Sequence, residues 1–522
     1  MNYTLKMYYE EAGIEPIPPW AKDITLRNPY TRELVKPMWH QVDGLARAFS
    51  MPNSRSGLFD DMGSGKTMPA QAFAIWNAWA NNKTVVLMPG VLLGQFLNSL
   101  KKMFSPVQEH LSAEIYHGAK AKRDKAVARW QTQGSPDIVL TTYDLFRKEY
   151  QIFCSLFHYD ALVMDECRVL GNPNSATALA ISSFMGRNGE KAALLMNGTP
   201  GKNSLADLFG YIDFLTPGVY KGKSGFDHMH VEYTTVDTVV PGKRGGLDIC
   251  KRLIVSGFRN LDQLYQNLYL QARRVEKEDV LKELPGKRLI PVHFKLSPKH
   301  KALYDKLVRE KLIIFADDSM IDISYSAAVR NTCMQIVVHP QMVQLDEESE
   351  IFKVLDELLE ELAPSSTNKV FILAHYRATI EKIGKRYEKY KPALIYGGSN
   401  TEKEKVRFQE DDNCLMCVAN YLSGGVGLDF QNNCHTVICF EPTTVPGDFK
   451  QAVDRVDRKG QLHKVFVYIL IATGTIYSKT VATMRKKDAE ILSVVSKGRL
   501  QAELCGSADD DEEVVDDDLE EW

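Results

Sequence analysis

Short apolar runs recur between helix-like segments along most of this chain. A first series reads TVVLM (84–88), DIVLTT (137–142), ALVMDE (161–166) and AALLMN (192–197). A second series reads KVFILA (369–374), PALIY (392–396), LMCVAN (415–420), TVICF (436–440) and VFVYILIA (465–472). Strands that alternate with helices are typical of βαβ units, in which the strands form parallel sheets. The pattern therefore predicts an α/β protein with two parallel-sheet lobes.

The two series are separated by a stretch, at about 218–345, that is mixed or mainly helical, with turn-like glycines in VPGKRGGLD (240–248). A chain of 522 residues has room for about two to four domains. The expected organisation is an N-terminal segment (1–36), a first lobe (37–285) with a helical insertion at about 218–285, a second lobe (286–500) with a helical insertion at about 297–345, and an acidic tail (501–522).

The charge is distributed unevenly. The net charge is −3, yet the last 14 residues, DDDEEVVDDDLEEW, contain ten acidic groups and no basic ones. Without these ten, the chain has 57 acidic and 64 basic groups, which gives a net charge of +7. A basic body with an acidic tail is the pattern expected of a polyanion binder that carries an interaction tail. Because the terminal run cannot bury a core, we expect it to be disordered.

The composition, with 44% hydrophobic and 25% charged residues, favours a soluble globular protein. The N-terminus lacks a secretory signal, and no apolar run approaches the roughly 20 residues of a membrane span. We therefore expect a cytoplasmic protein with no membrane partner. The nine cysteines are scattered, and the CxxC formed by Cys414 and Cys417 favours a buried strand over a metal site because no second cysteine or histidine pair accompanies it.

A phosphate-binding loop is predicted at GLFDDMGSGKT (57–67), where an apolar lead enters a glycine-rich turn. In such a loop backbone N–H groups cradle phosphate oxygens, the lysine meets the β- and γ-phosphates, and the hydroxyl binds Mg²⁺. The strict pattern requires glycine where this chain has Asp60, and a chance glycine-rich turn is the alternative. The candidate nucleotide-binding residues are Asp61, Met62, Gly63, Ser64, Gly65, Lys66 and Thr67.

A second half of the site is expected in YDALVMDEC (159–167), where an apolar strand delivers Asp165 and Glu166 to its end. Ligands of parallel sheets bind at this edge. Asp165, with Thr67, would hold Mg²⁺, and Glu166 would orient or deprotonate the attacking water. Acidic pairs after strands are common, and only the loop upstream makes a nucleotide site the favoured interpretation.

Two arginines, Arg455 and Arg458, stand three apart in QAVDRVDRKGQ (451–461). At helical spacing their guanidinium groups project from one face, which by itself indicates an ordinary solvated surface. The nucleotide site supplies an anion that needs such cations, and an arginine finger contributes about 10³–10⁵ in rate. We therefore expect these arginines, on the second lobe, to reach a nucleotide held at Lys66.

Together these motifs resemble helicase superfamily two and, within it, the Swi/Snf-type DNA translocases. The resemblance runs from about 37 to 490 and includes PMWHQVDGL (37–45), DDMGSGKT (60–67), VVLMPGVLLGQFLNSL (85–100), LTTYDLFRK (140–148), DECR (165–168), MNGTPGKN (196–203), VFILAHY (370–376), NYLSGGVGLDFQ (420–431) and QAVDRVDRKGQ. The segment 260–305 is the most specific part, because its paired Arg273 and Arg274, its DVLKELPGK turn and its LSPKHKALY helix resemble the lobe-joining segment of this family.

The resemblance implies two RecA-like lobes, ATP and Mg²⁺ as cofactors, Gln41 as the adenine-reading residue, and further nucleotide contacts from Gly425, Gly427 and Asp429. The chain departs from the family pattern at four motifs, the first of which has Phe96 in place of the usual tryptophan. Cys167 and Arg168 replace an alanine and a polar residue, Asn420 and Tyr421 replace a Ser/Thr pair, and Asp457 replaces a common histidine.

DNA contacts are expected to be mainly phosphate contacts. The resemblance implies a backbone track lined by Pro89, Gly90, Thr141, Thr142, Ser423 and Gly424. In the middle region we favour DNA contact for Lys243, Arg244, Lys251 and Arg252. Tyr143 either joins the track or packs as core, and the basic segment AKAKRDKAVARW (119–130) is either a solvated helix face or a DNA contact.

The sequence thus predicts a monomeric, ATP-dependent translocase on double-stranded or branched DNA. It would remodel forks, branches or protein–DNA complexes in repair, recombination or replication, in a prokaryotic cell or an infected host cell. The alternatives are an ATPase switch acting on a partner such as RNA polymerase, and an RNA helicase, against which the segment 260–305 counts. The tail at 509–522 either occupies the DNA track when DNA is absent, docks a protein partner, or only solubilises the chain.

Overall fold

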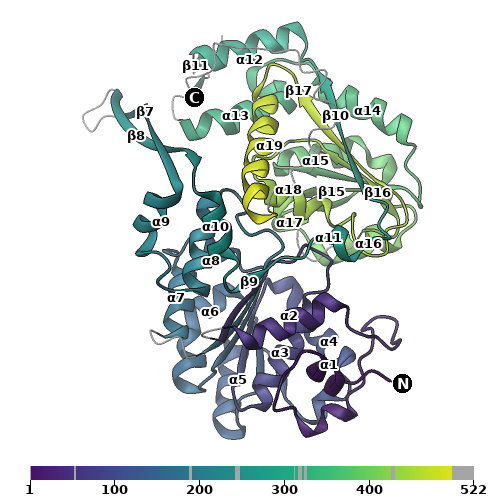
Figure 1. Ribbon diagram of the computed structural model, residues 1–522. Coiled ribbons are helices and arrows are strands. Elements are labelled where there is room, and N and C mark those ends of the chain that lie inside the picture. The colour runs from purple at the N-terminus through teal and green to yellow at the C-terminus, as the bar shows by residue number, and fades with distance from the viewer. Residues whose placement is uncertain are drawn as a thin grey trace. The chain divides into compact units, whose positions relative to one another are not determined.

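The computed structural model describes residues 2–51, 54–186, 191–241, 247–310, 312–314, 320–322, 326–424 and 430–496. The chain divides into two compact units, each built around its own parallel sheet (Figure 1). Unit 1 consists mainly of residues 2–232 and 257–282, and unit 2 mainly of residues 233–256 and 283–493.

Unit 1 contains a seven-stranded sheet of order β3–β4–β2–β5–β6–β1–β9, in which every neighbouring pair is parallel. Its strands are β1 (Arg55–Leu58), β2 (Thr84–Leu87), β3 (Ala113–Ile115), β4 (Ile138–Thr141), β5 (Ala161–Asp165), β6 (Ala192–Met196) and β9 (Ala272–Arg273). The central strands are buried on both faces, as parallel strands covered by helices on both sides must be. Their carboxyl ends meet at one edge, where the loops of the site begin.

The helices of unit 1 are α1 (Leu5–Glu11), α2 (Trp39–Ser50), α3 (Thr67–Trp79), α4 (Leu93–Met103), α5 (Lys120–Gln133), α6 (Tyr143–Gln151), α7 (Ala176–Met185), α8 (Leu208–Leu215), α9 (Gly222–His230), α10 (Leu261–Leu268) and α11 (Lys277–Val280). The N-terminal segment belongs to the same core, because Leu5, Tyr8 and Tyr9 of α1 are fully buried. The Tyr9 hydroxyl donates to the carbonyl of Ala72 in α3, at 2.8 Å, and so fixes α1 against the helix that follows the phosphate loop.

Unit 2 contains a six-stranded sheet of order β10–β17–β16–β13–β15–β14, again wholly parallel. Its strands are β10 (Lys287–Phe294), β13 (Lys369–Ala374), β14 (Ala393–Ile395), β15 (Met416–Asn420), β16 (Cys434–Cys439) and β17 (Val465–Ala472). Figure 1 shows β10 and β17 side by side although they lie far apart in the sequence.

The helices of unit 2 are α12 (Pro298–Glu310), α13 (Ser326–Val338), α14 (Glu350–Leu362), α15 (Arg377–Arg386), α16 (Thr401–Glu410), α17 (Tyr421–Gly424), α18 (Pro446–Val453) and α19 (Ile476–Val495). A small antiparallel pair, β11 (Leu312–Ile314) and β12 (Met320–Asp322), follows α12.

The α/β prediction and all nine predicted strands are confirmed, with ends shifted by at most a few residues. The apolar-run criterion missed β10, whose sequence KRLIPVHF contains a proline and alternates in burial. β10 has a single neighbour, β17, and proline is tolerated at such an edge because the missing N–H removes no interior ladder bond.

The stretch that we expected to be mixed or mainly helical contains a substantial β part. Between α9 and α10 the chain forms a two-stranded sheet of β7 (Val231–Pro241) and β8 (Leu247–Phe258). The segment VEYTTVDTVV is rich in β-branched residues, which favours a strand over a helix because their stiff side chains lose freedom against a helical turn. The helical description of the insertion at 218–285 is corrected to this extent.

The Cys414–Cys417 pair is buried as predicted, with Cys417 inside β15 and Cys414 just before it. Burial raises the pKa of the Cys417 thiol well above its ordinary value, which disfavours the thiolate that a metal ion requires. In the part of the chain that the structure describes, no helix combines the length and apolar character needed to cross a lipid bilayer.

Candidate functional site

The phosphate loop leaves the end of β1 and enters α3 at Thr67. Gly63 and Gly65 have φ angles of +81° and +86°, a left-handed region that residues with a Cβ adopt at a cost. A Cβ at Gly65 would also come within 2.5 Å of the Gln41 amide nitrogen. Both glycines of the predicted loop are therefore required by the backbone path.

Lys66 bonds back to the start of its own loop. Its ammonium donates to the carbonyl oxygens of Asp60 at 2.6 Å and Asp61 at 2.9 Å. Burial lowers the pKa of Lys66, and the carboxylates of Asp60, Glu166, Asp165 and Asp61 act in the opposite direction. The predicted lysine and the predicted acidic pair are thus brought into one electrostatic environment at the carboxyl edge of the unit 1 sheet.

Asp165 is the last residue of β5, and Glu166 is the first residue of the turn that follows. Tyr143, at the start of α6, donates its hydroxyl to the carbonyl of Asp165 at 2.7 Å, so this side chain braces the strand end. Glu166 has a φ of +52°, which is unusual for a residue with a side chain and is typical of functional turns. Its carboxylate lies 3.2 Å from the guanidinium of Arg168, the residue that departs from the family pattern. The charge of Glu166 is therefore matched by a neighbour from its own turn.

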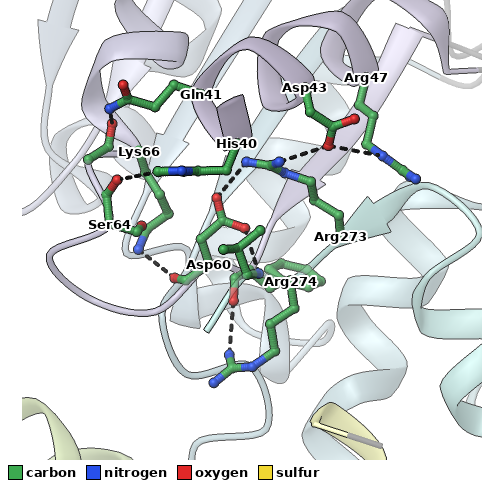
Figure 2. A network of polar contacts seen from close by, with 12 residues as sticks. His40, Gln41, Asp43, Arg47, Asp60, Ser64, Lys66, Arg273 and Arg274 are labelled. Atoms are coloured by element: carbon green, nitrogen blue, oxygen red, sulfur yellow. Dashed lines mark hydrogen bonds and ion pairs between the residues drawn. The ribbon is translucent and has the colours of Figure 1, made fainter. Parts of the chain in front are cut away.

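Two residues of α2 contact the loop directly (Figure 2). Gln41 accepts from the backbone N–H of Met38 at 2.9 Å and donates to the carbonyl of Gly65 at 3.1 Å. His40 bonds through Nε2 to the carbonyl of Ser64 at 2.8 Å, and burial lowers its pKa, so the neutral ring donates to that oxygen. The predicted Gln41 lies beside the loop, and His40 is a loop contact that the sequence reasoning missed.

Asp60, which stands where the strict loop pattern has glycine, is paired with Arg273 (Figure 2). The two side chains are 2.7 Å apart, and Arg273 also reaches Asp43 of α2 at 2.8 Å. Asp61 is paired with Arg274 at 2.5 Å. Asp60, Asp61 and both arginines are at most 7% exposed, so these pairs are interior contacts. The departure at position 60 is thereby explained, since the carboxylate has a buried partner more than 200 residues later in the chain.

The donor set fits a Mg²⁺ ion. Thr67 supplies a hydroxyl at the start of α3, and Asp165 supplies a carboxylate at the end of β5. Mg²⁺ prefers oxygen ligands and usually takes one or two from protein side chains, completing its shell with water and substrate phosphates. Among the described residues no cluster of three or more His, Cys, Asp or Glu side chains forms a complete metal site. Two protein oxygens beside a phosphate loop match the sparse coordination that this ion takes with a nucleotide.

The predicted DNA track of unit 1 is brought together in part. Gly90 lies opposite Thr142, whose methyl carbon would be 3.5 Å from a Cβ at that glycine. Thr142 caps α6 by accepting from the N–H of Leu145, and Pro89 is half-buried beside the exposed Gly90. Thr141 is fully buried in β4, which argues against a direct side-chain contact with DNA.

Four of the other predicted DNA contacts lie on β8 and α17. Lys251 is exposed on β8, and Arg252 is the next residue of the same strand. Ser423 and Gly424 form the end of α17. The remaining predicted DNA and nucleotide contacts, and the acidic tail, lie outside the described residues: Lys243, Arg244, Gly425, Gly427, Asp429 and 501–522.

The basic segment 119–130 forms α5, from which only Trp130 is buried. Three of its five basic residues face acidic neighbours: Lys120 pairs with Asp124, Arg123 with Glu149, and Arg129 with Glu114. This arrangement favours the interpretation as a solvated helix face.

The helical placement of Arg455 and Arg458 is wrong. α18 ends at Val453, and both arginines lie in the turns that follow it. The N–H of Phe430 bonds to the carbonyl of Arg455 at 2.9 Å, so that oxygen is used by a neighbouring loop and not by a helix. Both side chains are half-buried, and their pairing with a nucleotide stays a prediction.

A buried carboxylate that the sequence reasoning missed organises the loops of unit 2. Glu441 accepts from the N–H groups of His375 and Tyr376, at 2.6 and 3.1 Å, and from the Thr379 hydroxyl at 2.7 Å. The carbonyl of the same His375 accepts from the Asn420 amide at 2.6 Å. The position that departs from the Ser/Thr pattern therefore ties two loops of this unit together.

Comparisons with known proteins agree with this picture. Residues 30–348 match the SNF2-related domain family, and residues 350–460 match the helicase conserved C-terminal domain. The chain is 24% identical, over 87% of its length, to the probable ATP-dependent DNA helicase CHR12 of Arabidopsis thaliana, of which it covers 42%. It is 25% identical, over 88% of its length, to the DNA excision repair protein ERCC-6-like of Mus musculus, of which it also covers 42%. The chain thus spans about two-fifths of the length of these relatives.

Among solved structures, the Sulfolobus solfataricus SWI2/SNF2 ATPase core in complex with dsDNA is similar to this chain. The sequences are 22% identical, the match covers 91% of this chain and 96% of the other, and the TM-score is 0.37.

Proposed function

Because the chain belongs to the SNF2-related domain family, we propose that it is an ATP hydrolase that is stimulated by double-stranded DNA and moves along it. The observation that carries the proposal is the position of Lys66, half-buried in a loop whose backbone path requires Gly63 and Gly65, in the electrostatic field of the Asp165 and Glu166 carboxylates at the end of β5. A nucleotide phosphate with its Mg²⁺ fits this arrangement, because the lysine can meet the phosphate while the Asp165 carboxylate holds the metal ion.

Different residues of unit 1 would bind the phosphates, hold the metal ion and activate the attacking water. The backbone N–H groups of Gly63, Ser64 and Gly65 would cradle the phosphates, and Lys66 would leave its carbonyl partners to meet them. Thr67 and Asp165 would hold Mg²⁺, which supplies charge neutralisation at the phosphates. Glu166, at the strained turn after β5, would orient the attacking water and accept its proton.

Unit 2 would contribute Arg455 and Arg458 to the developing charge on the γ-phosphate. If these arginines reach that nucleotide, its binding and release would change how unit 2 engages it. Hydrolysis would then drive movement along DNA, which does not need base-specific contacts.

The finer role that we propose is remodelling of forks, branched DNA or protein–DNA complexes in repair, recombination or replication. The name of the mouse relative, a DNA excision repair protein, is compatible with this role. A switch protein that acts on a partner such as RNA polymerase remains the second candidate, since it would use the same nucleotide site. An RNA helicase is disfavoured by the segment 260–305, because this segment resembles the lobe-joining segment of the Swi/Snf-type DNA translocases.

The proposal is tested by measuring ATP turnover with forked DNA, branched DNA, linear duplex, single-stranded DNA and RNA, with Lys66→Ala as the inactive control. We expect stimulation by the duplex-containing DNAs and little by single strands or RNA. Displacement of a third strand from a triplex then separates movement from switching. Stimulation by RNA alone, or duplex-stimulated turnover without triplex displacement, would contradict the translocase.

A further inference from the structure

Asp60 and Asp61 each make contacts in two directions. Their backbone carbonyls accept from the ammonium of Lys66, at 2.6 and 2.9 Å. Their carboxylates point the other way, to Arg273 at 2.7 Å and Arg274 at 2.5 Å. The same two residues therefore touch both the cation that would bind phosphate and a segment that is far away in the sequence.

That segment is tied to the loop by backbone bonds as well. The N–H of Phe59 donates to the carbonyl of Arg273, and the N–H of Asp61 donates to the carbonyl of Val275, both at 2.9 Å. In return the N–H of Val275 donates to the Asp60 carboxylate at 3.0 Å, and that of Lys277 to the Asp61 carboxylate at 3.2 Å. Residues 273–277 thus follow the loop in register, and the chain then continues through Lys282 into unit 2.

Arg274 connects three places in unit 1. Besides Asp61 it donates to the carbonyl of Phe59 at 2.9 Å and to the carbonyl of Gly198, in the turn after β6, at 3.3 Å. A guanidinium offers several donors in one fixed plane, which lets a single side chain serve these three acceptors at once. The loop, the turn after β6 and the exit segment are therefore held by one group.

A bound phosphate would change this arrangement at its centre. The ammonium that now donates to Asp60 and Asp61 would turn to the phosphate, and the two carbonyls would lose their charged donor. Asp60 and Asp61 cannot move by themselves when the ammonium leaves, because their carboxylates are buried in ion pairs with Arg273 and Arg274. A buried pair resists separation, since removing one partner leaves an uncompensated charge.

We propose that Asp60 and Asp61, with Arg273 and Arg274, are positioning residues that make the exit segment 273–277 respond to nucleotide at Lys66. The inference rests on the proposed function, because it requires a nucleotide at the loop. It goes further by assigning the coupling between nucleotide and the chain that leads into unit 2 to four named side chains.

Arg274→Lys tests the assignment, because the ammonium keeps the charge beside Asp61 but cannot reproduce the planar contacts to Phe59 and Gly198. We expect ATP affinity and KM to stay within about twofold, while DNA-stimulated kcat falls about tenfold. The matched control is Arg407→Lys, the same substitution at an arginine of α16 whose side chain is 35% exposed and whose ion pair, with Glu404, is made within that helix. Its turnover should be unchanged.

Hydrogen exchange provides a readout that a purely structural role would not move. In the unaltered protein, ADP with Mg²⁺ should change the exchange of the amides at 273–281 by at least about twofold, and Arg274→Lys should lose this change while still binding ADP. The neutral pair Asp61→Asn with Arg274→Gln, which removes both buried charges together, repeats the test if the single variant folds poorly.

The outcomes separate the two proposals. If the unaltered protein is not stabilised by ADP with Mg²⁺ against thermal unfolding, the proposed nucleotide site itself is wrong. If it is stabilised but the amides at 273–281 do not respond, or if Arg274→Lys keeps full DNA stimulation, the positioning role is wrong and the nucleotide site stands.

Discussion

The two units build similar wholly parallel sheets but fix their functional loops by different chemistry. In unit 1 the phosphate loop is held by two buried ion pairs, Asp60 with Arg273 and Asp61 with Arg274. In unit 2 the loop after β13 is held by one buried carboxylate, Glu441, whose donors are two backbone N–H groups and a hydroxyl.

The difference has an electrostatic consequence. At Arg274 burial acts to lower the pKa, but Asp61 and other neighbours raise it above the ordinary value, so the pair keeps its charges. At Glu441 burial raises the pKa to about 7, and the neutral donors only partly oppose this. The Asp61–Arg274 pair therefore stays charged near neutrality, whereas the lone carboxylate of Glu441 titrates in that range. In the other pair, burial also raises the pKa of Asp60, and Arg273 and Lys66 oppose that rise.

The largest expected effect tests whether unit 2 supplies chemistry to the site in unit 1. Arg458→Ala should lower DNA-stimulated kcat by about 10³-fold or more with little change in ATP affinity, because an arginine finger acts mainly in the transition state. Steady-state turnover and binding of a fluorescent ATP analogue measure the two quantities. The exposed neighbour Lys459, changed to alanine, is the control, and full-rate turnover by Arg458→Ala would remove the arginine from the mechanism.

A somewhat smaller loss is expected inside unit 1. Glu166→Gln should lower kcat by about 10²–10³-fold, because the amide cannot accept a proton, while bound ATP is retained. Single-turnover hydrolysis and nucleotide binding distinguish this from a folding defect. Asp144→Asn, at a side chain that is 84% exposed, is the matched control. A variant that turns over normally would leave the acidic pair with a metal-binding role only.

The third prediction concerns the lone carboxylate of unit 2. The pKa of Glu441 rises from 4.5 to about 7 on folding, so between these values the native state holds a proton that the unfolded chain has lost. The free energy of unfolding therefore falls as pH rises through this window, by up to roughly 3 kcal/mol. Urea unfolding at pH 5 and pH 8 measures it, and Glu441→Gln should remove this part of the pH dependence. An equal dependence in both proteins would contradict the assignment.

The smallest effect is expected from the exposed charges of unit 1. Replacing Lys122 and Lys125 of α5 by alanine should change DNA affinity by less than about twofold and leave its salt dependence unchanged, if this helix is a solvated face. Binding measured at several salt concentrations checks this. A reduction of the salt slope by about two would instead show that both lysines contact phosphates.

Much of the fold could be predicted because it depends on local patterns. Strands such as β13 are apolar on both faces, and their spacing between helix-like segments specifies a parallel sheet. The phosphate loop could also be predicted from the sequence, since its backbone path requires Gly63 and Gly65 at positive φ angles that few other residues adopt. The prediction of a helix through Arg455 was wrong, because residue spacing does not show that the Arg455 carbonyl accepts from Phe430 in a neighbouring loop.

The sequence by itself determined the two sheets and the residues that could meet a phosphate, since periodicity and backbone preference act over a few neighbouring residues. Only the tertiary structure decided what Asp60 does in place of glycine, and that Glu441 and Asn420 join separate loops. Such contacts depend on which distant segments are buried together. A buried charge or amide must find its partner wherever the fold places one, and no local pattern specifies that position.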